Sequence, residues 1–248
     1  MKLLILSDIH ANWPALRAVL EAEPDAEQIL CLGDLVDYGP QPVECVEWAI
    51  KHVPVAWLIQ GNHDWGVGCN EDPRCSPPYR RLTEITQRHS LRLLNEESKK
   101  FLGELQPLRA FEIAGAKYVA CHAAPSGPLF RYLRTNGAGG QLEAEIETAG
   151  SPDFLFFGHT HWPVKIRSGK TLVINPGSVG QPKDGDPRAA YAVWQDGEIA
   201  LRRVAYDIEE TVHAYADTPL EAADVAALAH VLRTGGTLPQ KPPDGEAL

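Results

Sequence analysis

Leu3-Leu-Ile-Leu-Ser-Asp-Ile-His10 is a short apolar run that ends in a carboxylate and an imidazole. An unbroken run of this kind is typical of a strand buried on both faces, as in a parallel sheet covered by helices. Residues two apart on an extended chain point the same way, so Asp8 and His10 are expected to aim at one point beyond the strand end. A single Asp-x-His pair usually marks only a polar loop, so its significance depends on recurrence.

The same pattern recurs after four further apolar runs. These are Gly33-Asp34-x-x-Asp37 after residues 28–32, Gly61-Asn62-His63-Asp64 after residues 55–59, His122 after residues 117–121, and Gly158-His159-x-His161 after residues 154–157. In open α/β sheets, ligands bind at the carboxyl ends of the strands, so these side chains are expected to converge. The preceding glycines allow tight turns or a close approach of two backbones.

The segments between these runs alternate between strand and helix patterns, which predicts an α/β fold. Helical spacing covers residues 11–23, 42–52, 79–106 (as two helices) and 141–148, and residues 66–78 are expected to form a loop. Hairpins are expected for residues 111–121 and 189–204, the latter around Asp196-Gly197. Thr218-Pro219 opens a last helix that Gly235-Gly236 ends.

We therefore expect one domain over residues 1–234, which includes the C-terminal helix. Residues 235–248 follow it as a loose, flexible tail that contains three prolines.

Composition excludes several classes of partner. The 248 residues are 44% hydrophobic and 23% charged, with a net charge of −10 and no basic block. Long nucleic acids and anionic membranes are therefore not expected, because binding to them depends on clustered Lys and Arg. A small phosphorylated substrate remains compatible, since metal ions can supply positive charge locally. The first apolar run is too short for a signal peptide, which predicts a cytoplasmic protein.

The five cysteines do not form a disulfide pattern. Cys31, Cys45 and Cys121 lie in apolar or helical stretches, where buried free thiols are common. Cys69 and Cys75 share a loop and could pair or bind a metal, although free thiols are the more common outcome in a cytoplasmic chain.

The candidate ligands combine carboxylate and amide oxygens with imidazoles and include no thiolate. This donor set suits Mn, Fe, Co, Ni or Zn better than it suits a structural Cys-rich zinc site. There are enough ligands for two ions if one carboxylate bridges them. Two ions about 3.5–4 Å apart can activate a water and stabilise an in-line phosphoryl displacement. The residues therefore predict metal-assisted hydrolysis at phosphorus.

In their order along the chain, these motifs resemble the full motif set of the calcineurin-like metallophosphoesterases, over about residues 1–180. Asn175-Pro-Gly-Ser-Val-Gly-Gln181 and Gly185-Asp-Pro-Arg188 resemble the small bacterial branch related to diadenosine tetraphosphatases. The resemblance implies a sandwich of two mixed β-sheets flanked by helices. It also implies two divalent transition-metal ions, with Mn or Fe ahead of Zn, Ni and Co.

The resemblance further implies a role for each motif residue. Asp8, His10, Asp34 and His161 would hold one ion, and Asp34, Asn62, His122 and His159 the other, with Asp34 as the bridge. His63 resembles the histidine that protonates the leaving oxygen, and Asp37 the acid that orients it. Asp64 would either support the ligands from behind or cap a helix.

Two positions differ from the protein Ser/Thr phosphatases of this family. Where those enzymes carry phosphate-binding arginines, this chain has Tyr38 and Gln60. The difference favours a diester or a dinucleoside polyphosphate over a phosphoprotein.

Other side chains are candidates for substrate binding. Arg131, Arg134, Lys183 and Arg188 could supply substrate cations, and Tyr38, Phe130 and Tyr132 could stack on a base. We take Tyr38, Tyr132 and Arg188 as the predicted substrate contacts; solvated surface charges and rim packing are the alternatives.

The predicted partner is a small, nucleotide-like phosphorylated substrate. A phosphomonoesterase or protein phosphatase is the first alternative activity, and a non-catalytic metal-binding scaffold is the second. The sequence leaves the oligomeric state open.

Overall fold

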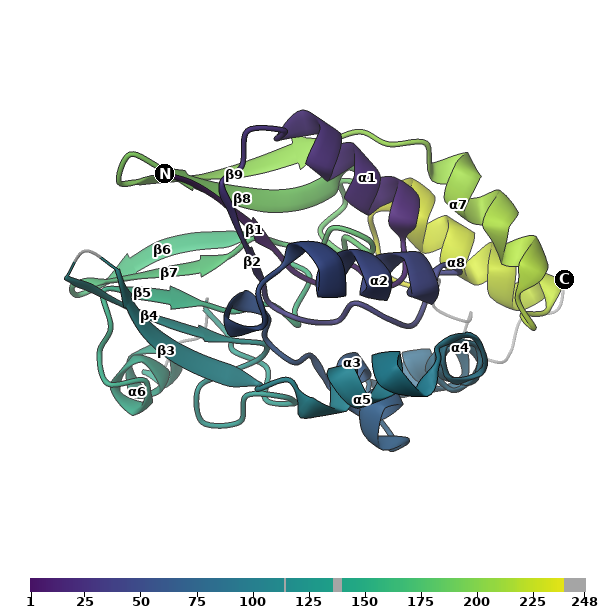
Figure 1. The fold of residues 1–248 in the computed structure, drawn as a ribbon, viewed down its shortest axis with the longest axis horizontal. Helices are drawn as coiled ribbons and strands as arrows, with labels where there is room; N and C mark the ends of the chain where they lie inside the picture. Colours follow the sequence, from purple (N-terminus) through teal and green to yellow (C-terminus); the bar gives the residue numbers. More distant parts are fainter. Residues whose placement is uncertain (114, 136–139, 239–248) are drawn as a thin grey trace, which may run out of the picture.

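The protein folds as a sandwich of two β-sheets with helices outside them (Figure 1). The structure, a computed structural model, describes residues 1–113, 115–135 and 140–238. The first sheet has the order β2 (Gln28–Cys31), β1 (Lys2–Leu6), β8 (Ala189–Gln195) and β9 (Glu198–Val204). The second has the order β3 (Leu108–Ile113), β4 (Ala116–Cys121), β5 (Phe154–Phe156), β7 (Thr171–Asn175) and β6 (Val164–Ser168). Both contain parallel and antiparallel pairs, which confirms the predicted mixed sheets.

The helices flank the sandwich on its outer faces and at one end (Figure 1). They are α1 (Trp13–Ala22), α2 (Pro42–His52), α3 (Asn62–Cys69), α4 (Arg80–Leu93), α5 (Glu96–Glu104), α6 (Gln141–Thr148), α7 (Ile208–Ala214) and α8 (Ala222–Thr234). Helices α1 and α2 pack on the first sheet and α6 packs on the second (Figure 1). At the start of α1, Asn12 Oδ1 accepts a hydrogen bond from Ala15 N at 3.2 Å, as expected of an N-cap.

Strand β1 is buried on both faces, as its unbroken apolar run predicts. Leu3 and Ile5 lie in the core between the sheets together with Phe156 of β5. Leu4 and Leu6 alternate with them and pack under α1 and α2. Burial of each such side chain stabilises the fold by about 1.5–3 kcal/mol. The sheet around β1 is not purely parallel, because β2 pairs with β1 in parallel and β8 pairs with it in the antiparallel direction.

The strand predicted for residues 55–59 is wrong. Val55–Trp57 form a short 3₁₀ helix, and the chain pairs with its neighbours only through single bridges at Leu58 and Ile59. Val55 follows a proline and is 56% exposed, so the first part of the run lies outside the sheet, whereas Leu58 and Ile59 are buried. Residue composition alone did not separate a half-exposed turn from a buried strand.

One element boundary and two whole elements also differ from the prediction. The loop expected at residues 66–78 starts too early, because α3 covers Asn62–Cys69. Strand Val164–Ser168 was not predicted; it is an edge strand in which half-buried apolar residues alternate with exposed charges. Helix Ile208–Ala214 was also not predicted, although Asp207 caps it by accepting from two backbone amides.

The C-terminal helices pack against the same end of the sandwich as α4. Tyr215 donates a hydrogen bond from its hydroxyl to the carbonyl of Tyr38 at 3.1 Å. Leu238 N donates to the Tyr79 hydroxyl at 3.1 Å, and Gly185 N donates to Gly235 O at 2.7 Å. The tail predicted for residues 235–248 lies largely at residues 239–248, outside the described residues.

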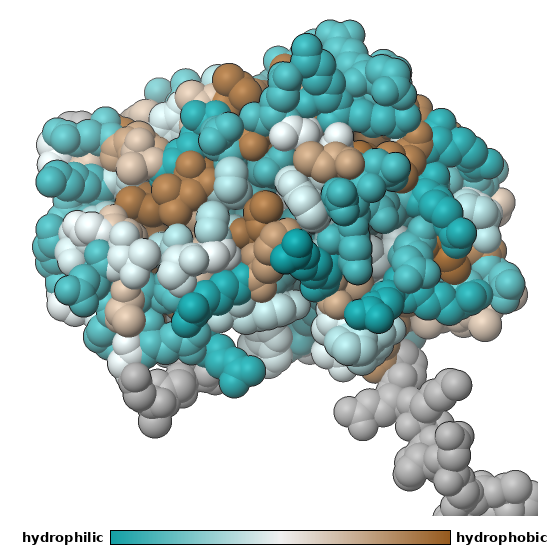
Figure 2. All heavy atoms as spheres, turned by 90° about the horizontal axis from the view of Figure 1, so that it is seen from below, coloured by the Kyte–Doolittle hydropathy of each residue, from teal (hydrophilic) through white to brown (hydrophobic). Residues whose placement is uncertain are grey.

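The surface seen in Figure 2 is largely hydrophilic, with apolar residues in separate patches. Within the described part of the chain, no helix combines the length and the apolar character needed to cross a bilayer. All five cysteines are free thiols, so Cys69 and Cys75 do not pair.

Candidate metal centre

The predicted ligands come together at one end of the sandwich. Asp8 and His10 follow β1, Asp34 follows β2, His122 follows β4, and His159 and His161 follow β5, whereas Asn62 is the first residue of α3. Each is at most 7% exposed. The ends of two sheets and one helix therefore supply a single buried cluster of polar atoms.

Four ligand atoms form the first half of the cluster. His10 Nε2 lies 3.2 Å from His161 Nε2, 3.7 Å from Asp34 Oδ2 and 4.0 Å from Asp8 Oδ1. His161 Nε2 is also 3.5 Å from Asp8 Oδ1. Two ligands bound about 2.1 Å from one ion lie at most about 4.2 Å from each other, and all four of these separations are within that limit.

Four atoms also form the second half, and one of them is shared. His122 Nε2 lies 3.2 Å from Asp34 Oδ2 and 3.0 Å from Asn62 Oδ1. His159 Nδ1 lies 3.0 Å from Asn62 Oδ1 and 3.2 Å from His122 Nε2. The same oxygen of Asp34 faces both halves, which is the position of a bridging carboxylate.

Three of the four imidazoles in the centre are oriented by backbone carbonyls behind them. His10 Nδ1 lies 3.1 Å from Val36 O, His122 Nδ1 2.8 Å from Leu32 O, and His161 Nδ1 2.6 Å from Gln181 O. A carbonyl only accepts, so these Nδ1 atoms carry the hydrogen. The Nε2 lone pairs of neutral rings then point into the centre, as metal-bound histidines require.

Charge in the centre also fits bound cations. Asp8 Oδ1 is buried and has no hydrogen-bond partner, and burial raises the pKa of Asp8 to about 6. Burial alone would lower the pKa of His122, yet the charge of Asp34 outweighs it and raises that pKa to about 9. Cations bound here would give the unpaired carboxylate of Asp8 a partner. They would also supply the positive charge that the surroundings of His122 favour. The residues therefore fit two divalent metal ions.

The backbone at the ligands is strained. Asp8, His10, Asp34, His159 and His161 all have φ between +47° and +64°. This left-handed backbone conformation is unfavourable for residues with a side chain, and outside glycine it occurs often at functional sites. The chain is thus not extended at Asp8 and His10, so the alternation argument for their common direction is wrong, although both reach the centre.

Glycines let the ligand loops approach closely, as the sequence predicts. A Cβ on Gly33, where φ is +94°, would lie 2.4 Å from Gly61 N. A Cβ on Gly61 would lie 2.1 Å from Asp34 Oδ1, and one on Gly158 would lie 2.0 Å from Ser7 Oγ. Any larger residue would push the loops apart.

His63 lies beside the centre, with its ring directed to another partner. His63 Nδ1 lies 2.9 Å from Asp37 Oδ2, and Ser90 of α4 donates to the other oxygen of Asp37 at 3.0 Å. Burial lowers the pKa of His63, but the charge of Asp34 and the bond to Asp37 outweigh it and raise that pKa. His63 is therefore held as a buried imidazole that favours its protonated form.

Asp64 joins two ligand loops. Its Oδ2 accepts from Asp34 N at 2.8 Å and from Gly61 N at 3.0 Å, and its Oδ1 accepts from Leu35 N at 2.8 Å. It therefore does both things that the sequence left open, because it caps α3 and also supports a ligand loop from behind.

We expect Asp64→Ala to destabilise the fold by about 3 kcal/mol or more, because three buried amides lose their acceptor. For a chain of this size the melting temperature should fall by roughly 6–12 °C. Differential scanning calorimetry measures it. Asp72→Ala is the control, since the exposed Asp72 accepts only from Arg74 N and its loss should cost under about 1 kcal/mol. Equal melting temperatures for the two variants would contradict this role of Asp64.

The predicted substrate residues are distributed unevenly. Tyr38 and Tyr132 line the opening of the centre together with Lys183, and the Tyr132 ring lies 4.2 Å from that of His159. The cavity there is about 20 Å³, the size of one water molecule, so substrate entry needs movement of wall side chains such as the exposed Tyr132. Arg188 is not among the lining residues and pairs with Asp186 at 2.6 Å.

Two other residues named from the sequence point elsewhere. Gln60 Nε2 donates to Leu102 O at 2.7 Å, behind the centre. Phe130 packs against Trp65 and the guanidinium of Arg74. Sequence reasoning also missed the carbonyls that orient the histidines, because every residue has a carbonyl and no motif marks them.

Comparisons with known proteins agree with this geometry. A sequence profile described as the Calcineurin-like phosphoesterase superfamily domain matches residues 1–196. The chain is 33% identical over 226 residues to an uncharacterized protein of Methanocaldococcus jannaschii, over 83% of this chain and 88% of that protein. It is 27% identical over 211 residues to the phosphodiesterase YfcE of Escherichia coli, over 81% of this chain and 91% of that protein.

A solved structure has the same fold. The crystal structure of a metallophosphoesterase from Sphaerobacter thermophilus superposes with a TM-score of 0.77 at 31% identity. The match covers 95% of this chain and 100% of that chain.

Proposed function

Because the chain belongs to the calcineurin-like phosphoesterase superfamily and is a hydrolase of phosphoester bonds, we propose that it cleaves phosphodiesters or dinucleoside polyphosphates with two metal ions. The observation that carries the proposal is Asp34 Oδ2, which lies 3.7 Å from His10 Nε2 and 3.2 Å from His122 Nε2. One carboxylate oxygen thus lies near both groups of proposed ligand atoms.

The proposed ligands of one ion are Asp8, His10, Asp34 and His161, and those of the other are Asp34, Asn62, His122 and His159. When bound, divalent transition-metal ions would activate a water and neutralise the charge of the phosphoryl group. The mixture of carboxylate, amide and imidazole donors suits Mn, Fe, Co, Ni or Zn, and the family resemblance favours Mn or Fe among them. The Asp8 and Asp34 carboxylates would offset part of the added positive charge.

His63 is proposed to protonate the leaving oxygen. It lies next to the ligands, its ring centroid being 5.1 Å from that of His10, and Asp37 fixes its orientation. A proton delivered to the departing oxygen avoids release of an alkoxide. Asp37 stabilises the charged ring before transfer and keeps the imidazole in place afterwards.

The wall of the centre supports a diester or nucleotide-like substrate. Tyr38 brings an aromatic ring to the opening, and Gln60 is bonded away from it. Neither supplies the bidentate cation that best grips a phosphate dianion. The complete ligand set together with His63 favours catalysis over a non-catalytic scaffold.

We expect bis-p-nitrophenyl phosphate or a dinucleoside polyphosphate to be hydrolysed with a kcat/KM about tenfold above that of phosphoserine peptides or p-nitrophenyl phosphate. The reason is that a monoester dianion lacks its bidentate arginine contact here, and the loss of one hydrogen bond to a charged group costs about that much. The assay uses metal-reconstituted protein and a panel of Mn, Fe, Co, Ni and Zn. Asp34→Ala should abolish all of these activities together. A phosphopeptide that is cleaved faster than every diester and dinucleotide would refute the proposed substrate class.

A further inference from the structure

Lys183 lies in the wall of the metal centre and has no role in the proposed chemistry so far. It lines the opening together with Asp34 and His161. Its ammonium lies 4.5 Å from the ring centroid of Tyr79 and 5.9 Å from that of Tyr38. Aromatic faces at these distances hold a cation without neutralising it.

Lys183 differs from the other candidate cations in its lack of an acidic partner. Among the residues that the structure describes, no carboxylate oxygen lies within 4.0 Å of its ammonium. Arg131, by contrast, pairs with Glu145 at 3.1 Å, and Arg188 pairs with Asp186. Their charges are already satisfied on the surface.

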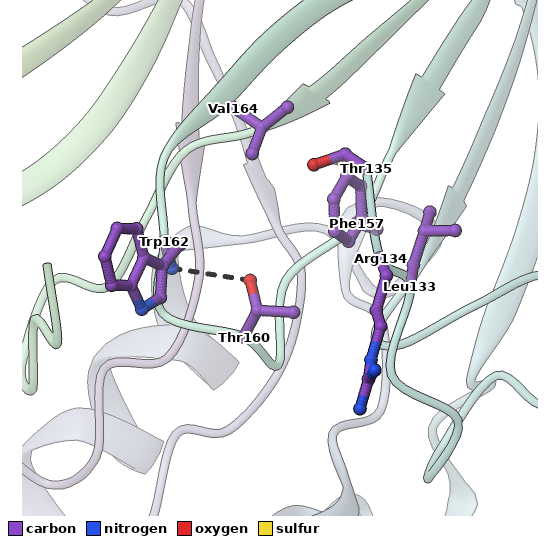
Figure 3. Close-up of a pocket in the computed structure, with 7 residues that line it drawn as sticks. All are labelled: Leu133, Arg134, Thr135, Phe157, Thr160, Trp162 and Val164. Atoms are coloured by element: carbon purple, nitrogen blue, oxygen red, sulfur yellow. Dashed lines mark hydrogen bonds between the residues drawn. The ribbon is translucent and has the colours of Figure 1, made fainter. Parts of the chain in front are cut away.

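Arg134 lies in a different cavity. This cavity, of about 330 Å³, is lined by Arg134 and also by Thr160 and Trp162 (Figure 3). It contains none of the metal ligands. Of the four cations considered from the sequence, Lys183 alone faces the centre, and it keeps its full capacity to bind an anion.

The backbone on both sides of Lys183 is anchored. Before it, Gln181 N donates to Ser178 Oγ at 2.8 Å. After it, Gly185 N donates to Gly235 O at the end of α8, where φ is +60° and a Cβ would lie 2.3 Å from Asp186 C. A cation on an anchored loop loses little conformational freedom when it binds a ligand.

The two aromatic walls are fixed as well. The Tyr38 hydroxyl accepts from Thr83 at 3.0 Å, and Tyr79 receives the hydrogen bond from Leu238 N. Tyr38 also lies 4.9 Å from the ring of His63, centroid to centroid, so the same ring borders the proposed acid and the ammonium. The lysine is therefore held close to where the phosphorus would react.

Building on the proposed function, we infer that the Lys183 ammonium binds a non-bridging oxygen of the phosphate group in the metal centre, in the diester substrate and in the phosphate product. Lys183 supplies one point charge, which matches the single negative charge of a diester phosphate, and does not replace the bidentate binding of a phosphate dianion by arginine. The C-terminal helices contribute to this binding indirectly, because Gly235 and Leu238 anchor the loop and the ring beside Lys183.

The test compares wild-type protein, Lys183→Gln and Lys183→Arg, all reconstituted with metal. Loss of a hydrogen bond to a charged group should weaken the binding of inorganic phosphate to Lys183→Gln by about 10- to 100-fold. Competitive inhibition and calorimetry both measure this affinity. The KM for bis-p-nitrophenyl phosphate should rise similarly, with a smaller change in kcat. Lys183→Arg keeps the charge and should retain most of the affinity. Lys100→Gln, an exposed lysine of α5, should match the wild type.

Phosphate affinity within threefold of wild type in Lys183→Gln would overturn the inference. So would a loss of metal content or melting temperature in that variant, since Lys183 would then act through the fold or the ions. If wild-type protein hydrolyses no phosphoester but binds phosphate through Lys183, the proposed function fails and the binding inference stands.

Discussion

Asp34→Ala is expected to lose both metal ions and to reduce phosphoester hydrolysis by roughly 10⁴-fold or more. The reason is that Asp34 Oδ2 faces both His10 Nε2 and His122 Nε2, and among the described residues no other carboxylate belongs to both halves of the centre. Elemental analysis after reconstitution should give two ions per wild-type chain and close to none in the variant.

The control for this result is Asp72→Ala, which removes an exposed carboxylate outside the centre. It should keep both ions and full activity. Circular dichroism checks that Asp34→Ala still folds, because Asp34 Oδ1 also accepts a hydrogen bond from His63 N. One ion or none in the reconstituted wild type, or two ions retained in the variant, would contradict the shared carboxylate.

His63→Ala is expected to keep its metals and to lose about 10²–10⁴-fold in rate on substrates with poor leaving groups, which is the usual contribution of a general acid. The loss should be smaller on p-nitrophenyl esters, because their phenolate leaves without a proton. Steady-state kinetics on an alkyl diester and on bis-p-nitrophenyl phosphate measures the difference. His52→Ala, an exposed histidine of α2, serves as the control.

The pH profile provides a second measure of His63. Without bound metal, Asp34 and Asp37 raise the pKa of His63 against the effect of burial. Ions bound to Asp34 would oppose its contribution, and the hydrogen bond to Asp37 would remain as the interaction that favours the protonated ring. Activity on alkyl diesters should fall as pH rises through the pKa of His63, and Asp37→Asn should move that fall to lower pH. Loss of metal from His63→Ala, or an equal slowing on both substrates, would make His63 a ligand or a structural residue.

Motif spacing predicted which side chains come together, because these residues follow apolar runs whose ends meet in space. Leu3–Leu6 alternate between two cores, and Asp8 and His10 follow them directly. This pattern depends only on local sequence and on the general position of strand ends in α/β folds. The run before Asn62 was misread as a strand, yet the Asn62 side chain still reaches the centre from the start of α3.

Only the tertiary structure decided how each side chain is aimed. The positive φ values at Asp8 and His10 are imposed by neighbouring loops, such as the bond from His10 N to Asp34 O at 2.9 Å. The choice of Lys183 over Arg188 as the proposed cation had the same origin, because the fold places Lys183 beside Tyr38 and Tyr79 at the opening of the centre and leaves Arg188 outside that opening. Pairing and burial are contacts between distant parts of the chain, whereas the sequence alone determined which chemical groups were available to meet.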